Sequence, residues 1–176
     1  MNVYLILLIY LYLFIGCSNG VEKEINENNQ LFDHEIVNPK IIISNTTSKV
    51  IEATANYLKK NKENDAVLYG EVQTHFFNDN NEHISILTAD TAKINELNNN
   101  FNAIGNVIVI SDSGLTLKTK KLFWDHQYKL VISNDSVEFT TKEKDTLYGV
   151  GFESDMDLSH WKILKPSGVT NRIINK

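Results

Sequence analysis

The sequence predicts an all-β fold built from stacked antiparallel strands. The main observation is a block that occurs three times, over residues 53–72, 89–107 and 119–137. Each copy runs through an apolar stretch, crosses a polar turn and ends with a small or turn-forming residue two positions before a valine. The copies start 36 and 30 residues apart (89−53 and 119−89). This repetition indicates one supersecondary unit that buries its apolar face by stacking on the next copy, which produces a long groove.

Two further observations support strands from Ile41 onward. Apolar and polar residues alternate with period two over residues 82–88, 114–119 and 137–141. Clusters of Asn, Asp, Ser and Gly separate these runs at residues 78–81, 98–100, 112–114 and 134–135. We therefore expect ten or more short strands, almost all antiparallel because the connections are too short for helical crossovers.

The chain opens with an uninterrupted apolar run over residues 3–15. This run has the length of the apolar part of a secretory signal and is shorter than the roughly 20 residues that a helix needs to span a bilayer. Gly16 and Cys17 follow directly, and the segment resembles the signal of a bacterial lipoprotein. The resemblance implies a signal peptide over residues 1–16 and lipid attachment at Cys17, at the periplasmic face of the inner membrane. An uncleaved anchor with an incidental cysteine is the alternative, and sorting to the outer membrane stays open.

The next segment predicts a tether. Residues 18–30 are polar and lack periodicity, which is typical of disorder, and residues 31–39 are ambiguous between tether and docking segment. We expect a lipidated N-terminus and flexible tether over residues 17–38, a periplasmic β-domain over residues 39–165 and a tail over residues 166–176.

Residues 48–61 form the best helix candidate in the chain. Their apolar spacing is imperfect for a helix, however, and the equivalent parts of the other two copies alternate as strands do. The repeat therefore predicts strand here as well.

The composition restricts the class of function. The chain has 176 residues, 42% of them hydrophobic, which suits one domain with a tether. A net charge of −5 argues against nucleic acid as a partner, because a protein that follows phosphates needs a basic stripe. The single cysteine excludes an internal disulfide.

The pleat of the strands predicts a continuous apolar interior. Side chains two positions apart point to the same face, so Gly70 lies with Val72, and Gly105 lies with Val107 and Val109. Glycines at these positions allow two backbones or a bound chain to approach closely, although a bulge or tight bend explains any single one as well. The glycines to which we assign a structural role are Gly70, Gly105, Gly149 and Gly151.

The C-terminal region carries a family resemblance. The Gly-x-Gly-Phe-Glu-Ser string that begins at Gly149 is followed by Leu158 and by Trp161-Lys-Ile. Upstream come the strings ATANYL, LTADTAKI and GLTLKTKKLFWD in this order. Together these motifs resemble the LptC family, the periplasmic component of the lipopolysaccharide-export machine, over about residues 39–165.

The resemblance implies a twisted, open β-jellyroll like that of OstA and LptA. It implies that lipopolysaccharide acyl chains pass from an inner-membrane ABC transporter into an apolar groove, and from there to an LptA-like periplasmic bridge protein. The residues expected to line this lipid-binding groove are Val72, Phe76, Ile86, Val107, Val109, Leu115, Leu117, Trp124, Ile132, Val137 and Phe139. For Trp124 taken alone, the favoured interpretation is a residue that fills the core, since large aromatic side chains are usually packed inside.

The sequence contains no catalytic motif. A Gly-x-Ser-x-Gly elbow, a His-Glu-x-x-His motif and a phosphate loop are absent, and the five histidines have no metal-ligand spacing. We therefore expect neither enzyme activity nor a cofactor or metal. Two alternatives stay open: a surface or periplasmic β-solenoid lipoprotein for binding or adhesion, and a polysaccharide-processing solenoid, which would need a carboxylate cluster on one sheet face.

Overall fold

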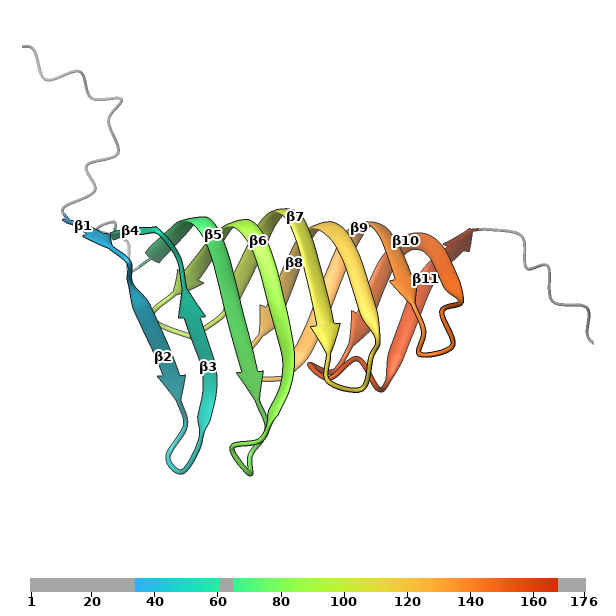
Figure 1. Ribbon diagram of the computed structural model, residues 1–176, viewed down its shortest axis with the longest axis horizontal. Coiled ribbons are helices and arrows are strands. Elements are labelled where there is room, and N and C mark those ends of the chain that lie inside the picture. The colour runs from blue at the N-terminus through green and yellow to red at the C-terminus, as the bar shows by residue number, and fades with distance from the viewer. Residues whose placement is uncertain (1–33, 61–64, 168–176) are drawn as a thin grey trace, which may run out of the picture. The chain divides into compact units, whose positions relative to one another are not determined.

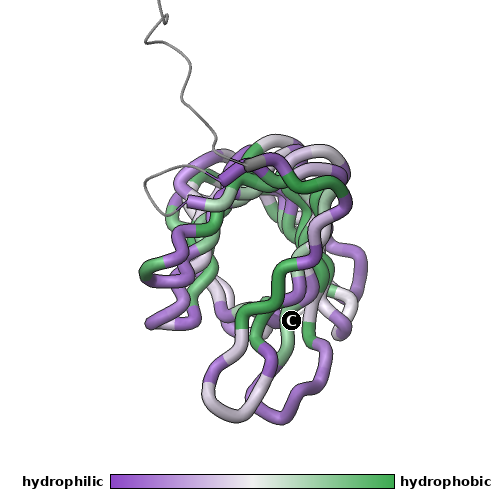
Figure 2. The backbone as a smooth tube through the Cα atoms, turned by 90° about the vertical axis from the view of Figure 1, so that its left-hand side faces the viewer, coloured by the Kyte–Doolittle hydropathy of each residue, from purple (hydrophilic) through white to green (hydrophobic). Residues whose placement is uncertain are grey.

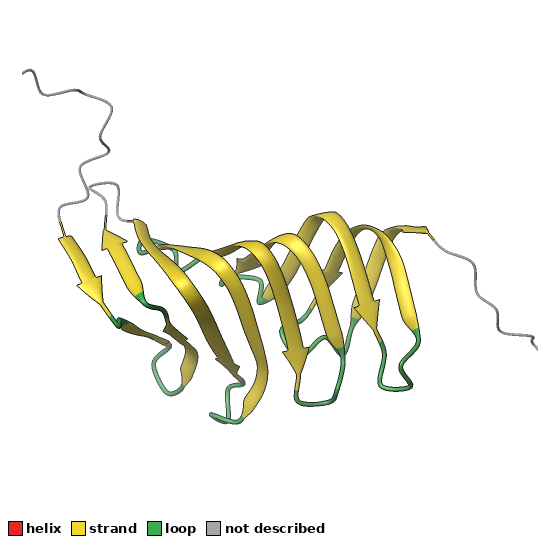
Figure 3. Cartoon of the chain, turned by 45° about the horizontal axis from the view of Figure 1, so that its top comes forward, coloured by secondary structure: helices red, strands yellow, loops and turns green. Residues whose placement is uncertain are grey.

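A computed structural model describes residues 34–60 and 65–167 of the chain, and these residues form one antiparallel sheet of eleven strands (Figures 1 and 3). The strands are β1 His34–Val37, β2 Lys40–Ser44, β3 Lys49–Thr54, β4 Tyr57–Lys60, β5 Asp65–Phe77, β6 His83–Asn95, β7 Phe101–Ser111, β8 Thr116–Asp125, β9 Leu130–Thr140, β10 Thr146–Ser154 and β11 Trp161–Ser167. The all-β prediction is confirmed, including the strands β3 and β4 within residues 48–61.

From β5 onward the strands follow one another in chain order across the sheet, whereas β1 pairs with β4 and β2 pairs with β3. From β5 to β11 each strand pairs with the next one, whereas β5 also pairs with both β4 and β3 on its other edge. Together β3 and β4 therefore occupy the place of one bent strand beside β5. Several strands are longer than expected, with 13 residues in both β5 and β6, because a strand continues through its bend and does not end there.

A line of β-bulges bends the sheet. Tyr69 and Val72 of β5 pair with Thr91 and Ala89 of β6, so β5 carries one residue more than its neighbour. The same excess occurs in β7 between Ile104 and Val107, opposite β8, and in β9 between residues 133 and 136, opposite β10. An extra residue of this kind bends a strand and increases its twist. We call this line the corner, defined by residues 70–71, 105–106 and 134–135.

The corner explains the sequence repeat. Each block ends at Val72, Val107 or Val137, which is the first buried residue after a bulge. The second and third blocks begin at the corner, run out along one strand, turn, and return to the corner along the next strand. The repeating unit is thus a hairpin that makes up half the width of the sheet.

The corner divides the sheet into two halves, each with its own row of turns. The first rim consists of the described turns 96–100, 126–129 and 155–160, and the second rim consists of turns 45–48, 78–82, 112–115 and 141–145. Viewed along the stack, the strands wind round a common centre (Figure 2). The two halves therefore face each other across a shared interior.

The limits of the sheet differ slightly from those expected. β1 begins at His34, before the expected domain start at Pro39, and pairs with β4. The expected signal peptide, the lipid-attachment residue Cys17 and most of the tether and tail lie outside the described residues. Within the described residues there is no helix with the length and apolar character that a bilayer crossing requires.

Candidate functional site

The interior between the two half-sheets is the candidate site. It is lined by alternate residues of every long strand, because the pleat sends side chains two apart to the same face. In β5 the buried positions include Leu68, Val72, Thr74 and Phe76, while Glu71 and Gln73 between them are exposed. The result is a continuous apolar core.

Most of the predicted groove residues point into this interior. The buried ones are Val72, Phe76, Val107, Val109, Leu115, Leu117, Trp124, Val137 and Phe139. Whether these residues contact lipid stays a prediction, since burial alone does not distinguish a lipid path from a packed core.

Two predicted groove residues, Ile86 and Ile132, lie on the wrong face. In β6 the buried positions are Ser85 and Leu87, so Ile86 between them points outward. In β9 the buried positions are Val131 and Ser133, so Ile132 points outward as well. Both segments carry apolar residues on both faces, and for this reason alternation alone does not identify the inner one.

Several further interior residues are not among the predicted groove residues. They include Leu68, Leu87, Phe101, Leu122, Phe152 and Leu158. Phe101 shares its face with Ala103 in β7, so alternation counted from residue 101 identifies it. Leu158 lies in a turn of the first rim, where no periodicity exists to reveal it.

Aromatic side chains join the two half-sheets near the rims. Phe76, just before the second rim, contacts Phe101 and Trp124 of the opposite half, with ring centroids 6.2 and 5.9 Å apart. Phe139 of β9 contacts Phe152 of β10 at 5.3 Å and Trp161 of β11 at 4.6 Å. Such contacts add a geometric preference to the burial of large apolar surfaces.

Polar contacts also cross from one rim to the other. Lys129 of the first rim donates to both carboxylate oxygens of Asp79 on the second rim at 2.9 Å. The Ser85 hydroxyl donates to the carbonyl oxygen of Met156 at 2.8 Å. The rims are therefore linked in this conformation, and a bulky ligand can enter between them only if these contacts separate.

Polar side chains within the interior fall into two groups. The Thr119 hydroxyl is 2.9 Å from that of Ser133, and both are satisfied. In contrast, Thr74 Oγ1, Trp124 Nε1 and His126 Nδ1 are buried and have no hydrogen-bond partner within the described residues.

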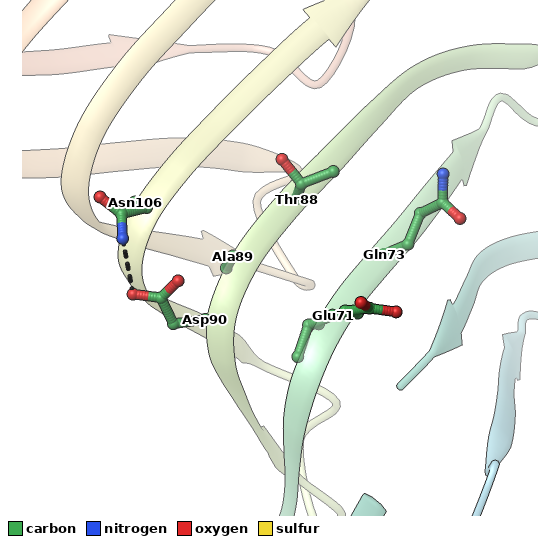
Figure 4. A pocket seen from close by; sticks show the side chains of 7 residues that line it. Glu71, Gln73, Thr88, Ala89, Asp90 and Asn106 are labelled. Carbon is green, nitrogen blue, oxygen red and sulfur yellow. Dashed lines mark hydrogen bonds between the residues drawn. The ribbon is translucent and has the colours of Figure 1, made fainter. Parts of the chain in front are cut away.

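On the outer surface, the corner contains a shallow hollow lined by Glu71, Gln73, Thr88, Asp90 and Asn106 (Figure 4). The Asn106 amide donates to Asp90 at 2.9 Å. The Asp90 side chain covers Gly105, where an added Cβ would collide with the carboxylate. Glu71 points away from Asp90 in Figure 4. This arrangement fits a structural bend and provides no acid–base pair.

Of the other glycines with an assigned role, Gly149 is required by close packing. A Cβ there would lie 2.7 Å from the carbonyl oxygen of Lys165 and would collide with Ile163 of β11. Gly70 and Gly151 have positive φ angles of 75° and 82°.

Charged groups gather on the outer face of β2, β3, β5 and β6. Hydrogen bonds from Lys40 and Lys49 lower the pKa of Glu52 to about 2. Nearby, His75 Nδ1 lies 3.0 Å from His83 Nε2, and His83 contacts Asp112 at 2.9 Å. Desolvation and the neighbouring His83 lower the pKa of His75. Among the described residues, no three His, Cys, Asp or Glu side chains are grouped to hold a metal ion.

Comparison with known proteins agrees with this architecture. A family model described as LptC, lipopolysaccharide-assembly, LptC-related, matches residues 5–169. A search of curated proteins found no match.

Proposed function

This chain belongs to the LptC-related family of lipopolysaccharide-assembly proteins, and from that premise we propose that its interior binds lipopolysaccharide acyl chains and passes them to a periplasmic bridge protein. The family is a non-enzymatic component of lipopolysaccharide transport with a β-jellyroll fold, periplasmic and associated with the inner membrane. The chain is accordingly a transport component and not an enzyme.

The observation that carries the proposal is the continuous apolar interior between two half-sheets, which are joined at the corner and linked by side-chain contacts at the rims. An acyl chain that takes the place of those contacts leaves water, and each buried CH₂ group contributes about 0.8 kcal/mol. Because the strands are stacked along one direction, the apolar lining continues from strand to strand, as a long chain requires.

The ends of the sheet support transfer to a neighbour. Within the described residues, β1 and β2 each pair with one strand only, and so does β11 at the other end. Exposed apolar side chains accompany both ends, with Ile36, Val37 and Ile42 at one and Trp161 and Leu164 at the other. An unpaired edge of this kind accepts a strand of a similar jellyroll, so that the two sheets become continuous. We propose that one end meets the inner-membrane ABC transporter and the other the LptA-like bridge.

We further propose that lipid attached to Cys17 anchors the chain to the inner membrane and that residues 17–38 include the tether. Replacing Cys17 with Ser should abolish incorporation of labelled fatty acid while leaving the sheet folded. Fatty acid retained by Cys17→Ser would contradict the lipid anchor.

Photo-crosslinking tests the interior directly. A photoreactive phenylalanine analogue at Val107, Leu117 or Phe139 should capture lipopolysaccharide, because these side chains are buried between the half-sheets. The same analogue at Ile86 or Ile132 is the matched control, since these residues lie on the outer face of β6 and β9. Capture at the two control positions but not at the interior positions would reject the proposal.

Depletion of the protein tests transport in cells. Lipopolysaccharide should then accumulate in the inner membrane. Normal surface lipopolysaccharide after depletion would instead favour a binding or adhesion lipoprotein.

A further inference from the structure

We propose that the interior contains a polar subsite beside Phe76, formed by Thr74, Trp124 and His126, that binds an acceptor oxygen at the head of an acyl chain. The ligand group is an amide or ester carbonyl, or a hydroxyl close to it. This inference rests on the proposed function and specifies which part of the lipid the interior recognises.

The first observation is the position of the unpartnered polar atoms. Four buried side-chain polar atoms in the described ranges have no hydrogen-bond partner, on Thr74, Trp124, His126 and Thr141. Three of the four belong to residues that are connected to Phe76 along β5 or through ring contacts. Trp124 contacts Phe76 at 5.9 Å and His126 at 5.2 Å between ring centroids, and Thr74 lies two residues before Phe76 on the same face of β5.

The second observation is the degree of burial. Thr74 is 0% exposed and Trp124 is 1% exposed, so water at the surface does not reach their polar atoms. A buried donor without a partner costs free energy, and native proteins pair nearly all such groups. Three buried polar groups without partners, on residues connected through Phe76, therefore point to a ligand that supplies the missing hydrogen bonds.

The other buried hydroxyls provide the contrast. Ser85 donates to Met156, the Ser111 hydroxyl is 2.8 Å from that of Ser113, and Thr119 pairs with Ser133. Among the described residues these interior hydroxyls are thus satisfied, and Thr141 is an exception. The other three unpartnered polar atoms lie on Thr74, Trp124 and His126.

The chemistry of the donors identifies the ligand group. An indole N–H only donates, so Trp124 requires an acceptor. The Thr74 hydroxyl donates or accepts, and His126 Nδ1 donates or accepts according to its tautomer. A carbonyl oxygen has two lone pairs and can accept from two such donors at once. In an acyl chain, oxygens of this kind occur at the head, where the chain is joined to its sugar.

The surroundings restrict the ligand further. Phe76 of one half-sheet and Phe101 and Trp124 of the other form an aromatic contact across the interior, which suits hydrocarbon next to the oxygen. Within the described residues, no lysine or arginine side chain hydrogen-bonds to these three polar groups, and a neutral oxygen is therefore the matching partner. A free phosphate or other anion would lack a cation here.

Paired lipid probes test the subsite. One probe is a glucosamine that carries a long β-hydroxyacyl amide, and the other is a glucoside with an alkyl ether chain of equal length, without the carbonyl and the hydroxyl. The full-length protein should bind the acyl probe about tenfold more tightly, which is the ratio that a hydrogen bond of ordinary strength gives.

Two variants should remove this preference. Thr74→Val keeps the side-chain shape without the hydroxyl, and Trp124→Phe keeps an aromatic ring beside Phe76 without the N–H. Each should weaken binding of the acyl probe several-fold. Thr74→Val should leave binding of the alkyl probe unchanged, whereas Trp124→Phe, whose ring also contacts the hydrocarbon, should weaken binding of the alkyl probe less than that of the acyl probe. Equal loss for both probes would show that only packing was disturbed and would overturn the proposal.

Thermal unfolding without ligand gives a second readout. Thr74→Val should raise Tm, because it removes a buried hydroxyl that has no partner. Thr119→Val is the matched control and should lower Tm, because the Thr119 hydroxyl has partners in Ser133 and Ser136. A fall in Tm for Thr74→Val would mean that this hydroxyl is already satisfied, which contradicts the subsite.

The outcomes separate this inference from the function on which it rests. If Phe139 captures lipid in the photo-crosslinking experiment but wild-type protein binds both probes equally, the subsite is rejected and lipid binding stands. If neither probe binds and no interior position captures lipid, the proposed function itself fails.

Discussion

At the residue scale, two histidines experience opposite environments. His75 is half-buried on the outer face, and desolvation together with His83 lowers its pKa below 6.5. His160 lies in the last turn of the first rim, where the Asp155 carboxylate at 2.7 Å raises its pKa above 6.5. His75 therefore favours the neutral state and His160 the charged state in the folded protein.

These shifts predict how folding depends on pH. The folded pKa of His75 is depressed, so its contribution to stability is complete above pH 6.5 and is lost as the pH falls through its folded pKa. For His160 the pKa is raised, so its contribution is complete below pH 6.5 and is lost as the pH rises through its folded pKa. NMR titration of the imidazole protons should find His75 titrating at lower pH than His160. In His75→Gln the loss of stability just below pH 6.5 should be smaller than in wild type.

The reverse order of the two titrations would contradict these environments. His160→Gln is the control: it should leave the acid side of the profile unchanged and reduce the change above pH 6.5. The environment of His75 does not follow from spacing in the sequence, because His75 meets His83 only through the pairing of β5 with β6.

At the element scale, the corner depends on residues that permit a bend. Gly105 in β7 has a φ of +80°, a conformation that costs residues with a Cβ about 1–2 kcal/mol. Asp90 of the neighbouring β6 fills the space that a side chain at Gly105 would occupy. The bulge of β7 and the shape of β6 are thus fitted to each other.

Replacement of Gly105 with Ala tests the cost of backbone strain together with the cost of displacing Asp90. We expect a loss in the free energy of unfolding of about 2–4 kcal/mol, from backbone strain and from displacement of Asp90. Urea denaturation measures the loss.

Gly114→Ala is the matched control for this change. Gly114 also has a positive φ, of 90°, but an added Cβ there meets no atom within 4 Å. The Gly114→Ala variant should therefore lose only the free energy that backbone strain costs. Equal losses for the two variants would mean that the fit between Asp90 and Gly105 contributes nothing.

At the scale of the folded unit, the two half-sheets are held together through the interior. Phe76 is 1% exposed and contacts aromatic rings of the opposite half, and the Lys129–Asp79 ion pair joins the rims above it. Both members of that ion pair are largely exposed, so it contributes little in water. The aromatic contacts are the stronger link.

Phe76→Ala should consequently destabilise the fold by about 3–5 kcal/mol, the usual cost of removing a buried phenylalanine. Ile110→Ala is the control, because Ile110 is exposed on the outer face of β7 and should cost less than about 1 kcal/mol. Urea denaturation compares the two. A cost for Phe76→Ala no larger than that for Ile110→Ala would show that the half-sheets do not depend on this contact.

The sequence by itself determined the class of fold and the main features of its interior. Alternation and the repeated block predicted antiparallel strands and the buried valines, because these features depend on neighbouring residues along one strand. For Gly70 and Gly105 the sequence left open both a close approach and a bulge, and the structure places a bulge at each. The family resemblance was also available from local motifs, and the family match over residues 5–169 confirms it.

Only the tertiary structure decided which face of a two-sided strand is buried and which strands meet across the interior. Ile86 and Ile132 were placed inside because both faces of their strands carry apolar residues, and pairing with neighbouring strands then turned Leu87 and Val131 inward. The contact of Phe76 with Trp124 joins residues from opposite halves of a sheet bent at the corner. Alternation with a period of two residues shows only which residues of a single strand share a face, whereas this contact depends on the combined bend of several strands.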